Sequence, residues 1–357
     1  KIYEKSPIGV EFYEGAMLAV DSMRKQGCKA IISVYDTGHD TTAVNKLISE
    51  GKLAQADLLI GPFYQTNLLQ VMDYARRHKI HVVSPFITAN KIILRNENLS
   101  KAKPCVQTTV EEIAKYIGKR YCNERPGSVV SKNIVVIHNG DPVELMLVNL
   151  FTDRLKSVAN PTGDPVDVVK IEPMIKVAKY KERGIAAVEE ALSLADTNIL
   201  FIPSGDQVFV SKVISRLNPK HEDYNIVVFG LPEWQYFNNL ESDYLHNMNI
   251  HIATPSYIDY ERTQVKQFIR AFISHYNSYP GTYAFEGFDI TWFYLNALKN
   301  YGSKFQTYLP DMTSQSLQTD FKYKKIDSTG GYENKNVFIL SYQDYQLILA
   351  SPMVDEN

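Results

Sequence analysis

The side chains best suited to chemistry in this chain lie directly after predicted β-strands. In open α/β sheets, ligands bind beyond the carboxyl ends of the strands, so the loops that follow strands are the places to inspect. The candidate binding residues in these loops are Phe63, Tyr64, Gln65, Ser84, Phe86, Thr88, Asn139, Asp141, Ser204, Asp206, Glu233 and Trp234. They offer hydroxyl, amide and carboxylate groups beside aromatic faces, which predicts a site for a small polar solute.

Two of these loops present charged or oriented groups. The turn at 61–66 leads into a predicted helix whose unpaired amide groups can receive an anion. Glu233 can pair with a cationic group, and the neighbouring Trp234 can add a flat apolar or cation–π wall. Gly, Pro, Asp and Ser also dominate turns that bind nothing, so turn formation stays the alternative for each of these residues.

The motif spacings that catalysis requires are absent from the sequence. Ser84 lies in SPF rather than in G-x-S-x-G, and there is no HExxH motif, P-loop or GxGxxG. Cys28, Cys105 and Cys122 form no C-x-x-C arrangement, and the 8 histidines are dispersed. We therefore predict a protein that is not an enzyme and uses no metal or cofactor, and the disulfide state of the cysteines stays open.

Composition narrows the class of partner and the number of domains. The 38 basic residues are scattered and the net charge is −2, so the basic stripe that nucleic-acid phosphates require is not expected. No apolar run approaches the roughly 18 residues of a membrane-spanning helix. A chain of 357 residues exceeds one compact core, which predicts two domains.

The elements that must position these loops form two series of alternating strands and helices. The first series opens with a helix whose apolar face includes Phe12 and Met23. Its other predicted elements are strands at 30–35, 56–60 and 80–83 and helices at 42–48 and 67–78. This alternation indicates a parallel sheet with helices on both faces, a Rossmann-like lobe. Such a lobe normally starts with a strand, so we expect its first strand to lie upstream of residue 1.

A crossing segment at 106–109 and a helix at 110–121 lead into the second series. Its predicted elements are strands at 133–138, 166–171, 198–202 and 225–229 and helices at 143–157, near 184–194 and at 207–217. The chain then crosses back at 250–258 into two helices, and strands at 337–340 and 346–350 form an antiparallel pair on the second lobe. The predicted boundaries are 1–107 and 257–318 for lobe one, and 108–256 and 319–357 for lobe two.

Several motifs resemble the type I periplasmic binding proteins, the family of the leucine/isoleucine/valine-binding proteins. The resemblance covers nearly the whole chain, and its most specific parts are FYEGAMLAVDSMRKQG with VYDTGHDT, the loops IGPFYQT and VVSPF, and the return from ATPSYIDY to FEGFDITWFYL. In that return, the family pattern YA-x-x-G-[FY]-D is met by Tyr283, Ala284, Gly287, Phe288 and Asp289. The N-terminal part also resembles substrate-binding proteins of Bacteroidetes-type bacteria, sometimes found beside peptidoglycan-binding LysM modules.

The resemblance implies two Rossmann-like lobes with three crossing segments, a ligand captured in the interlobe cleft, and closure by a hinge. It also implies that Thr88 and loop amides hold a ligand carboxylate and that Glu233 pairs with a ligand ammonium, while Gln65 stands where the family usually has a serine. The expected function is a non-enzymatic solute-binding protein, periplasmic or anchored in the cell envelope by a lipid upstream of residue 1. It would present an amino acid or short peptide to an ABC transporter permease or a sensor.

Two alternatives share this fold. A cell-envelope protein could keep the fold, lose the ligand and recruit peptidoglycan or a cell-wall synthase, since the bulky Phe63, Tyr64 and Phe86 can fill a cleft. The effector lobe of a LacI-type repressor would need a helix-turn-helix upstream, and the long YAFEGFD return fits the transport branch better.

Overall fold

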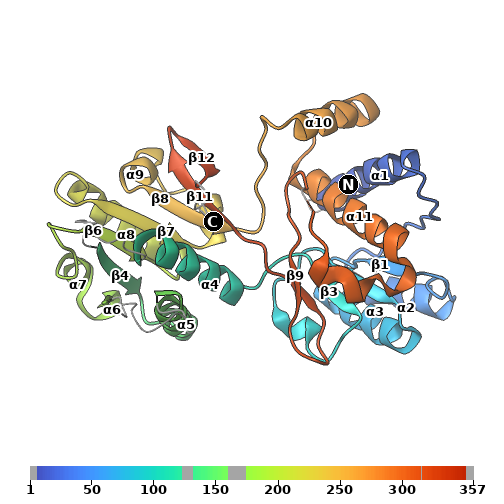
Figure 1. Cartoon of the computed structure of the whole chain (residues 1–357), viewed down its shortest axis with the longest axis horizontal. Helices are drawn as coiled ribbons and strands as arrows, with labels where there is room; N and C mark the ends of the chain where they lie inside the picture. Colours follow the sequence, from blue (N-terminus) through green and yellow to red (C-terminus); the bar gives the residue numbers. More distant parts are fainter. Residues whose placement is uncertain (1–5, 123–131, 160–173, 315, 351–357) are drawn as a thin grey trace, which may run out of the picture. The chain divides into compact units, whose positions relative to one another are not determined.

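The computed structural model describes residues 6–122, 132–159, 174–314 and 316–350. The chain forms two compact units, each with one sheet flanked by helices (Figure 1). Unit 1 comprises Lys1–Cys105 and Ser256–Asn336, and unit 2 comprises Val106–Pro255 and Val337–Asn357. The chain therefore passes between the units at 105/106, at 255/256 and at 336/337. The predicted α/β class with parallel sheets in two lobes is confirmed.

Unit 1 contains a five-stranded sheet in the order β1-β2-β3-β10-β9. Its strands are β1 (Leu58–Ile60), β2 (His81–Ser84), β3 (Leu99–Lys101), β9 (Tyr323–Lys325) and β10 (Tyr332–Asn334). All neighbours are parallel except β10 and β9. The predicted strands at 56–60 and 80–83 are confirmed, whereas β3, β9 and β10 are short and polar and escape prediction from apolar patterning.

Helices cover this sheet and agree with the predicted ones. They are α1 (Ser6–Lys25), α2 (Thr41–Ser49), α3 (Gln65–His78), α10 (Thr263–Tyr276) and α11 (Thr282–Tyr301), with the 3₁₀ segments η1 (Asn90–Ile93) and η5 (Gly302–Asp311). Asp40 caps α2 by accepting the amide hydrogen of Thr42 at 2.8 Å. This hydrogen bond satisfies one of the amide donors that the start of a helix leaves unpaired.

The two longest helices of unit 1, α1 and α11, approach each other closely through glycines. A Cβ atom on Gly15 would overlap the carbonyl oxygen of Ala284, and one on Gly287 would overlap the carbonyl oxygen of Phe12. Both glycines belong to the motifs FYEGA and YAFEGFD. The absence of side chains at these positions is therefore what allows the two backbones to pack together.

Unit 2 contains a seven-stranded sheet in the order β12-β11-β8-β7-β6-β4-β5. Its strands are β4 (Lys132–His138), β5 (Ile175–Lys179), β6 (Thr197–Phe201), β7 (Ile226–Gly230), β8 (Ile250–Thr254), β11 (Phe338–Gln343) and β12 (Gln346–Leu349). The five strands from β5 to β8 in this order are parallel, and β11 and β12 are antiparallel. The predicted strands at 133–138, 198–202 and 225–229 and the final antiparallel pair are confirmed.

Helices flank both faces of this sheet. They are α4 (Val106–Ile117), α5 (Pro142–Ala159), α6 (Tyr180–Arg183), α7 (Ile185–Glu189), α8 (Gln207–Leu217) and α9 (Ser242–Asn247), with the π-helical turn η2 (Gly118–Cys122) and the 3₁₀ turns η3 (Asn218–Lys220) and η4 (Pro232–Tyr236). The apolar runs of β4, β6 and β7 are buried in one core cluster with α4, α5 and α8. Burial on both sides explains why these strands read as continuous apolar runs.

The predicted strand at 30–35 is wrong. This segment has no regular secondary structure and exposes apolar side chains, with Ile31 98% and Val34 59% exposed. In the sheet, β1 is the terminal strand, and no strand within the described ranges pairs with its outer edge. An apolar run forms a strand only where a neighbour satisfies its backbone groups, and here that neighbour is not among the described strands.

Three further expectations differ from the structure. Residues 106–109, predicted as a crossing segment, form the start of α4. Residues 319–336, assigned above to lobe two, lie in unit 1 because β10 pairs with β3. The predicted strand at 166–171 lies outside the described residues.

A buried ion network joins two of the three places where the chain leaves unit 1. Glu333 in β10 and Lys101 in β3 are both fully buried, and Lys101 Nζ lies 3.3 Å from Glu333 Oε1. The same oxygen accepts the amide hydrogen of Cys105 at 2.7 Å, and Oε2 accepts from Lys335 Nζ at 2.5 Å. Burial raises the pKa of Glu333, but the two lysines and the amide outweigh it and lower the pKa to about 2.

The contact between α1 and α11 predicts a position-specific effect of adding one methyl group. Gly15→Ala should lower the stability of unit 1 by about 1–3 kcal/mol or more, because the methyl group overlaps a carbonyl oxygen of α11. The matched control is Gly9→Ala in the same helix. No heavy atom lies within 4 Å of a Cβ atom at this position, and alanine stabilises a helix by up to about 1 kcal/mol relative to glycine. Urea unfolding, with hydrogen exchange of α1 and α11 peptides to identify unit 1, measures both. Equal midpoints for the two variants would contradict the packing described here.

The ion network predicts a large effect of neutralising one partner. Glu333→Gln should destabilise unit 1 by about 3–5 kcal/mol near neutral pH, because it leaves the charge of buried Lys101 without its carboxylate. Adding Lys101→Met should recover at least about 1 kcal/mol, since the uncompensated charge is then gone. Urea unfolding of the parent, the two single variants and the double variant measures this coupling.

The pH dependence of the unfolding free energy provides a control for these substitutions. Glu333 has a folded-state pKa of about 2, below its ordinary value of 4.5, so its stabilising contribution is present above pH 4.5 and is lost as the pH falls toward 2. The stability difference between the parent and Glu333→Gln should therefore narrow over that range. A difference that stays constant would show that the charge of Glu333 does not stabilise the fold.

Candidate functional site

The loops that follow β1 and β2 in unit 1 are joined by an aromatic cluster. The ring centroids of Phe63 and Phe86 lie 4.7 Å apart in an edge-on arrangement. Phe12 of α1 lies 4.9 Å from Phe63, and Tyr283 of α11 lies 5.7 Å from Phe86. Phe63 and Phe86 are only partly buried, so this cluster forms an apolar surface at the carboxyl edge of the sheet.

The polar candidates in the same loops differ in how accessible they are. Gln65 and Thr88 are exposed, and no side chain caps the first turn of α3, which begins at Gln65. The ring of Tyr64 lies against that of His39, with centroids 3.5 Å apart. Ser84 is fully buried, and its Oγ has no hydrogen-bond partner among the described residues. Exposed donors at this edge are therefore supplied by Gln65, Thr88 and the start of α3.

In unit 2, two of the predicted carboxylates cap helices. Asp141 Oδ1 accepts the amide hydrogen of Val143 at 2.8 Å, directly before α5. Asp206 Oδ1 accepts from the amides of Val208 and Phe209 at 2.9 and 3.2 Å at the start of α8. Each carboxylate satisfies amides that a helix start leaves unpaired. The turn-forming alternative thus accounts for both aspartates.

The remaining carboxylate of the unit 2 loops, Glu233, is exposed. It lies beside the loop that follows β6, because a Cβ atom on Gly205 would be 3.7 Å from its Cγ. Asn139 is partly buried, and its amide donates to Glu144 Oε2 at 2.7 Å. Glu233 is therefore the predicted carboxylate that the local backbone does not use.

Trp234 differs from the expected ligand wall. It is only 3% exposed, and its ring lies over Gly230, where a Cβ atom would overlap the indole. Its Nε1 donates to the backbone oxygen of Ser204 at 2.8 Å. Ser204 is itself buried, and its Oγ accepts the amide hydrogen of Asp206 at 3.2 Å. The hydrogen bond between Trp234 and Ser204 therefore holds the loops after β6 and β7 together inside unit 2.

Three aromatic residues at the carboxyl edge of the unit 1 sheet are not among the residues predicted from the sequence. His39 pairs with Tyr64, while Phe12 and Tyr283 complete the aromatic cluster. From the sequence, Phe12 is predicted to be a core residue of the first helix, and Tyr283 is part of the YAFEGFD motif. Only the packing of α1 against α11 shows that both lie beside the loops after β1 and β2. No local signal in the sequence identifies this contact.

The loops offer groups for hydrogen bonding, for charge pairing and for apolar contact. Within the described ranges, no group of three or more His, Cys, Asp or Glu side chains is placed to hold a metal ion. No helix in this part of the chain combines the length and apolar character needed to cross a membrane. The loops instead combine an exposed carboxylate, exposed hydroxyl and amide groups and a partly open aromatic surface.

Comparison with known proteins identifies the fold. No protein-family model matches the chain, and neither does any curated protein sequence. Among solved structures, it is similar to a putative branched-chain amino acid ABC transporter protein from Rhodospirillum rubrum, with a TM-score of 0.71, 13% identity, and coverage of 97% of this chain and 96% of that one. An ABC-type branched-chain amino acid transporter protein from Rhodopseudomonas palustris gives a TM-score of 0.63, 11% identity, and coverage of 96% and 91%.

A third similar structure is an ABC transporter substrate-binding protein from Desulfitobacterium hafniense in complex with Leu, with a TM-score of 0.59, 13% identity, and coverage of 95% of both chains. Nothing in these comparisons bears on the Bacteroidetes-type or LysM-associated resemblance. At such low identity the likeness concerns the fold, and the fold of this chain is that of the type I periplasmic binding proteins.

Proposed function

We propose that this protein is a non-enzymatic, extracytoplasmic solute-binding protein for a small polar ligand of the amino acid or short peptide class. It would serve an ABC transporter or a sensor. The observation that carries the proposal is the set of exposed polar groups at the carboxyl edges of the two sheets, in a fold shared with amino acid-binding proteins of transporters. In open α/β sheets this edge is where ligands bind.

The charges available at these edges suit a zwitterion. An amino acid has an ammonium group and a carboxylate group, which need an anionic partner and a set of hydrogen-bond donors. Glu233 is the exposed carboxylate of the unit 2 loops that does not cap a helix, so it suits the ammonium group. Thr88, Gln65 and the uncapped start of α3 in unit 1 supply donors for the carboxylate.

The aromatic cluster of unit 1 adds a preference for ligands with an apolar part. Phe63 and Phe86 are held edge-on to each other and braced by Phe12 and Tyr283, so their exposed portions form a rigid surface. Rigid aromatic side chains bind ligands at little cost in conformational entropy. We therefore expect amino acids with apolar or aromatic side chains to bind more tightly than small polar ones.

A ligand screen tests the proposal directly. The purified protein, shown to be folded and free of copurified ligand, should gain thermal stability with amino acids or short peptides. At a ligand concentration of about 100 times the dissociation constant, the gain is about 2.7 kcal/mol. Sugars and muropeptides serve as comparison ligands. A response to none of the amino acids and peptides, confirmed by calorimetric titration, would overturn the proposal.

Substitutions separate ligand contacts from residues that hold the loops. Glu233→Ala and Thr88→Ala should each abolish ligand-induced stabilisation and leave the unliganded melting temperature nearly unchanged, because both side chains are exposed. Asp206→Ala should lower the unliganded stability by about 0.5–2 kcal/mol, because it removes the cap of α8. Thermal unfolding of each variant with and without ligand measures both effects. Parent-like ligand responses in the Glu233 and Thr88 variants would remove those residues from the site.

A further inference from the structure

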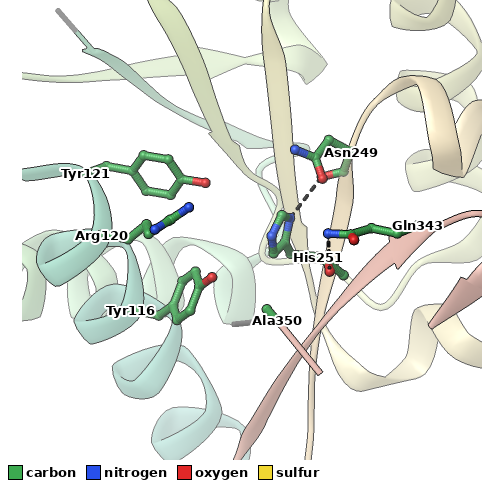
Figure 2. A pocket seen from close by; sticks show the side chains of 8 residues that line it. Tyr116, Arg120, Tyr121, Asn249, His251, Gln343 and Ala350 are labelled. Carbon is green, nitrogen blue, oxygen red and sulfur yellow. Dashed lines mark hydrogen bonds between the residues drawn. The ribbon is translucent and has the colours of Figure 1, made fainter. Parts of the chain in front are cut away.

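Unit 2 contains a polar cavity that the proposed function does not use. It has a volume of about 120 Å³ and lies between the C-terminal end of α4 with its π-helical turn η2, the start of β8, and β11 (Figure 2). Its lining includes Tyr116, Arg120, Tyr121, His251 and Gln343. A single water needs roughly 10–15 Å³ measured in this way, so the cavity has room for a small polyatomic group.

This cavity is separate from the loops discussed above. Its lining residue Asn249 directly precedes β8, and Arg120 lies in η2, which follows α4. The candidate solute contacts of unit 2, in contrast, follow the ends of β4, β6 and β7. A ligand of the cavity would therefore contact a different set of residues from the proposed solute.

Arg120 gives the cavity a positive charge that no carboxylate among the described residues neutralises. It is exposed, and it lies beside Tyr121 in the lining of the cavity. Within the described ranges, no carboxylate pairs with Arg120 and none is among the residues that line the cavity. A guanidinium has five N–H donors in a fixed planar arrangement that matches the oxygens of an oxyanion. Figure 2 shows Arg120 between the rings of Tyr116 and Tyr121, whose hydroxyl groups add two more possible donors.

His251 supplies the opposite kind of group, a hydrogen-bond acceptor. Its Nδ1 lies 2.9 Å from the backbone oxygen of Asn249, which can only accept, so Nδ1 carries the hydrogen. In the neutral ring Nε2 is then an acceptor, and it lies on the side of the ring that faces Tyr116 and Arg120 (Figure 2). The ring is held in place by stacking on Phe229, with centroids 4.7 Å apart. Burial lowers the pKa of His251 to about 4, so the ring is neutral near pH 7.

The amide of Gln343 is also oriented at this cavity. Its Nε2 donates to Ser341 Oγ at 3.1 Å, and both residues belong to β11, which pairs with β8 (Figure 2). Strand pairing places Ser341 directly opposite His251. The cavity thus brings together a cation, phenol hydroxyls, an amide and a neutral imidazole acceptor from α4, η2, β8 and β11.

We propose that this cavity binds a small oxyanion that still carries a proton, with hydrogenphosphate as its best match. The charged oxygens would accept hydrogen bonds from Arg120 and the tyrosine hydroxyls, and the hydroxyl of the anion would donate to Nε2 of His251. A fully deprotonated anion such as sulfate or acetate cannot donate to that nitrogen and would leave its lone pair facing an anionic oxygen. The site therefore distinguishes oxyanions by their proton as well as by their charge.

The test uses the full chain and inorganic phosphate at pH 7. Isothermal titration calorimetry should show one phosphate site in the parent, and Arg120→Gln should weaken binding by at least about tenfold. The matched control is Arg216→Gln, which removes the same charge from an exposed position on α8 of the same unit and should leave binding unchanged. Absence of phosphate binding in the parent at about 10 mM, or equal binding by Arg120→Gln, would overturn the proposal.

Anion selectivity tests the part assigned to His251. In the parent, phosphate should bind at least about tenfold more tightly than sulfate or acetate, because only hydrogenphosphate donates to Nε2. A phosphate monoester in the same series distinguishes free phosphate from a phosphorylated compound as the source of the anion. Equal affinities for phosphate and sulfate would overturn the proposal. Because this titration contains no amino acid or peptide, its failure leaves the solute-binding proposal unaffected.

Discussion

The constraint on which the arrangement of unit 1 depends is the full burial of the Glu333 carboxylate. A buried charge is tolerated only where other groups compensate it, and here the compensation comes from Lys101, Lys335 and the amide of Cys105. Cys105 is the last residue of unit 1 before the first passage to unit 2, and Lys335 lies just before the third. The need to satisfy one carboxylate therefore fixes both chain exits to the edge of β10 and keeps residues 319–336 in unit 1.

The second passage is held by a different buried carboxylate, Asp289 in the GFD motif of α11. It accepts the amide hydrogens of three consecutive residues, 317–319, at 2.7–2.9 Å. Burial raises the pKa of Asp289 to about 7 against the opposing effect of these amides. In the loop that Asp289 holds, the backbone oxygen of Gln318 accepts the amide hydrogen of Tyr257. The backbone oxygen of Ser316 accepts a guanidinium hydrogen from Arg262 Nη1. Asp289 thus acts on the fold, although its motif first draws attention through family resemblance.

Sequence patterning predicts the helices and strands that bury apolar side chains. It fails for strands that bury polar side chains and for strands whose pairing partner is distant in the sequence. The runs at β4, β6 and β7 and the capped helix α8 are recognised because local apolar content and caps define them. The strands β3 and β10 read as LSK and YEN, and only the long-range pairing of Lys101 with Glu333 explains their burial. The apolar run at 30–35 shows the converse, since hydrophobic content alone does not supply a pairing partner.

The candidate site was less predictable than the fold, because the sequence does not reveal whether a polar side chain is already satisfied by its own backbone. Asp141, Asp206 and Glu233 are equivalent in the sequence, each a carboxylate in a loop after a strand. In the structure, the two aspartates accept amide hydrogens from helix starts, whereas Glu233 remains exposed beside the next loop. Trp234 follows the same logic, because its N–H is taken by Ser204 inside the unit. Capacity for a ligand therefore resides in the groups that the local backbone does not use, and this criterion separates Glu233 from the two aspartates.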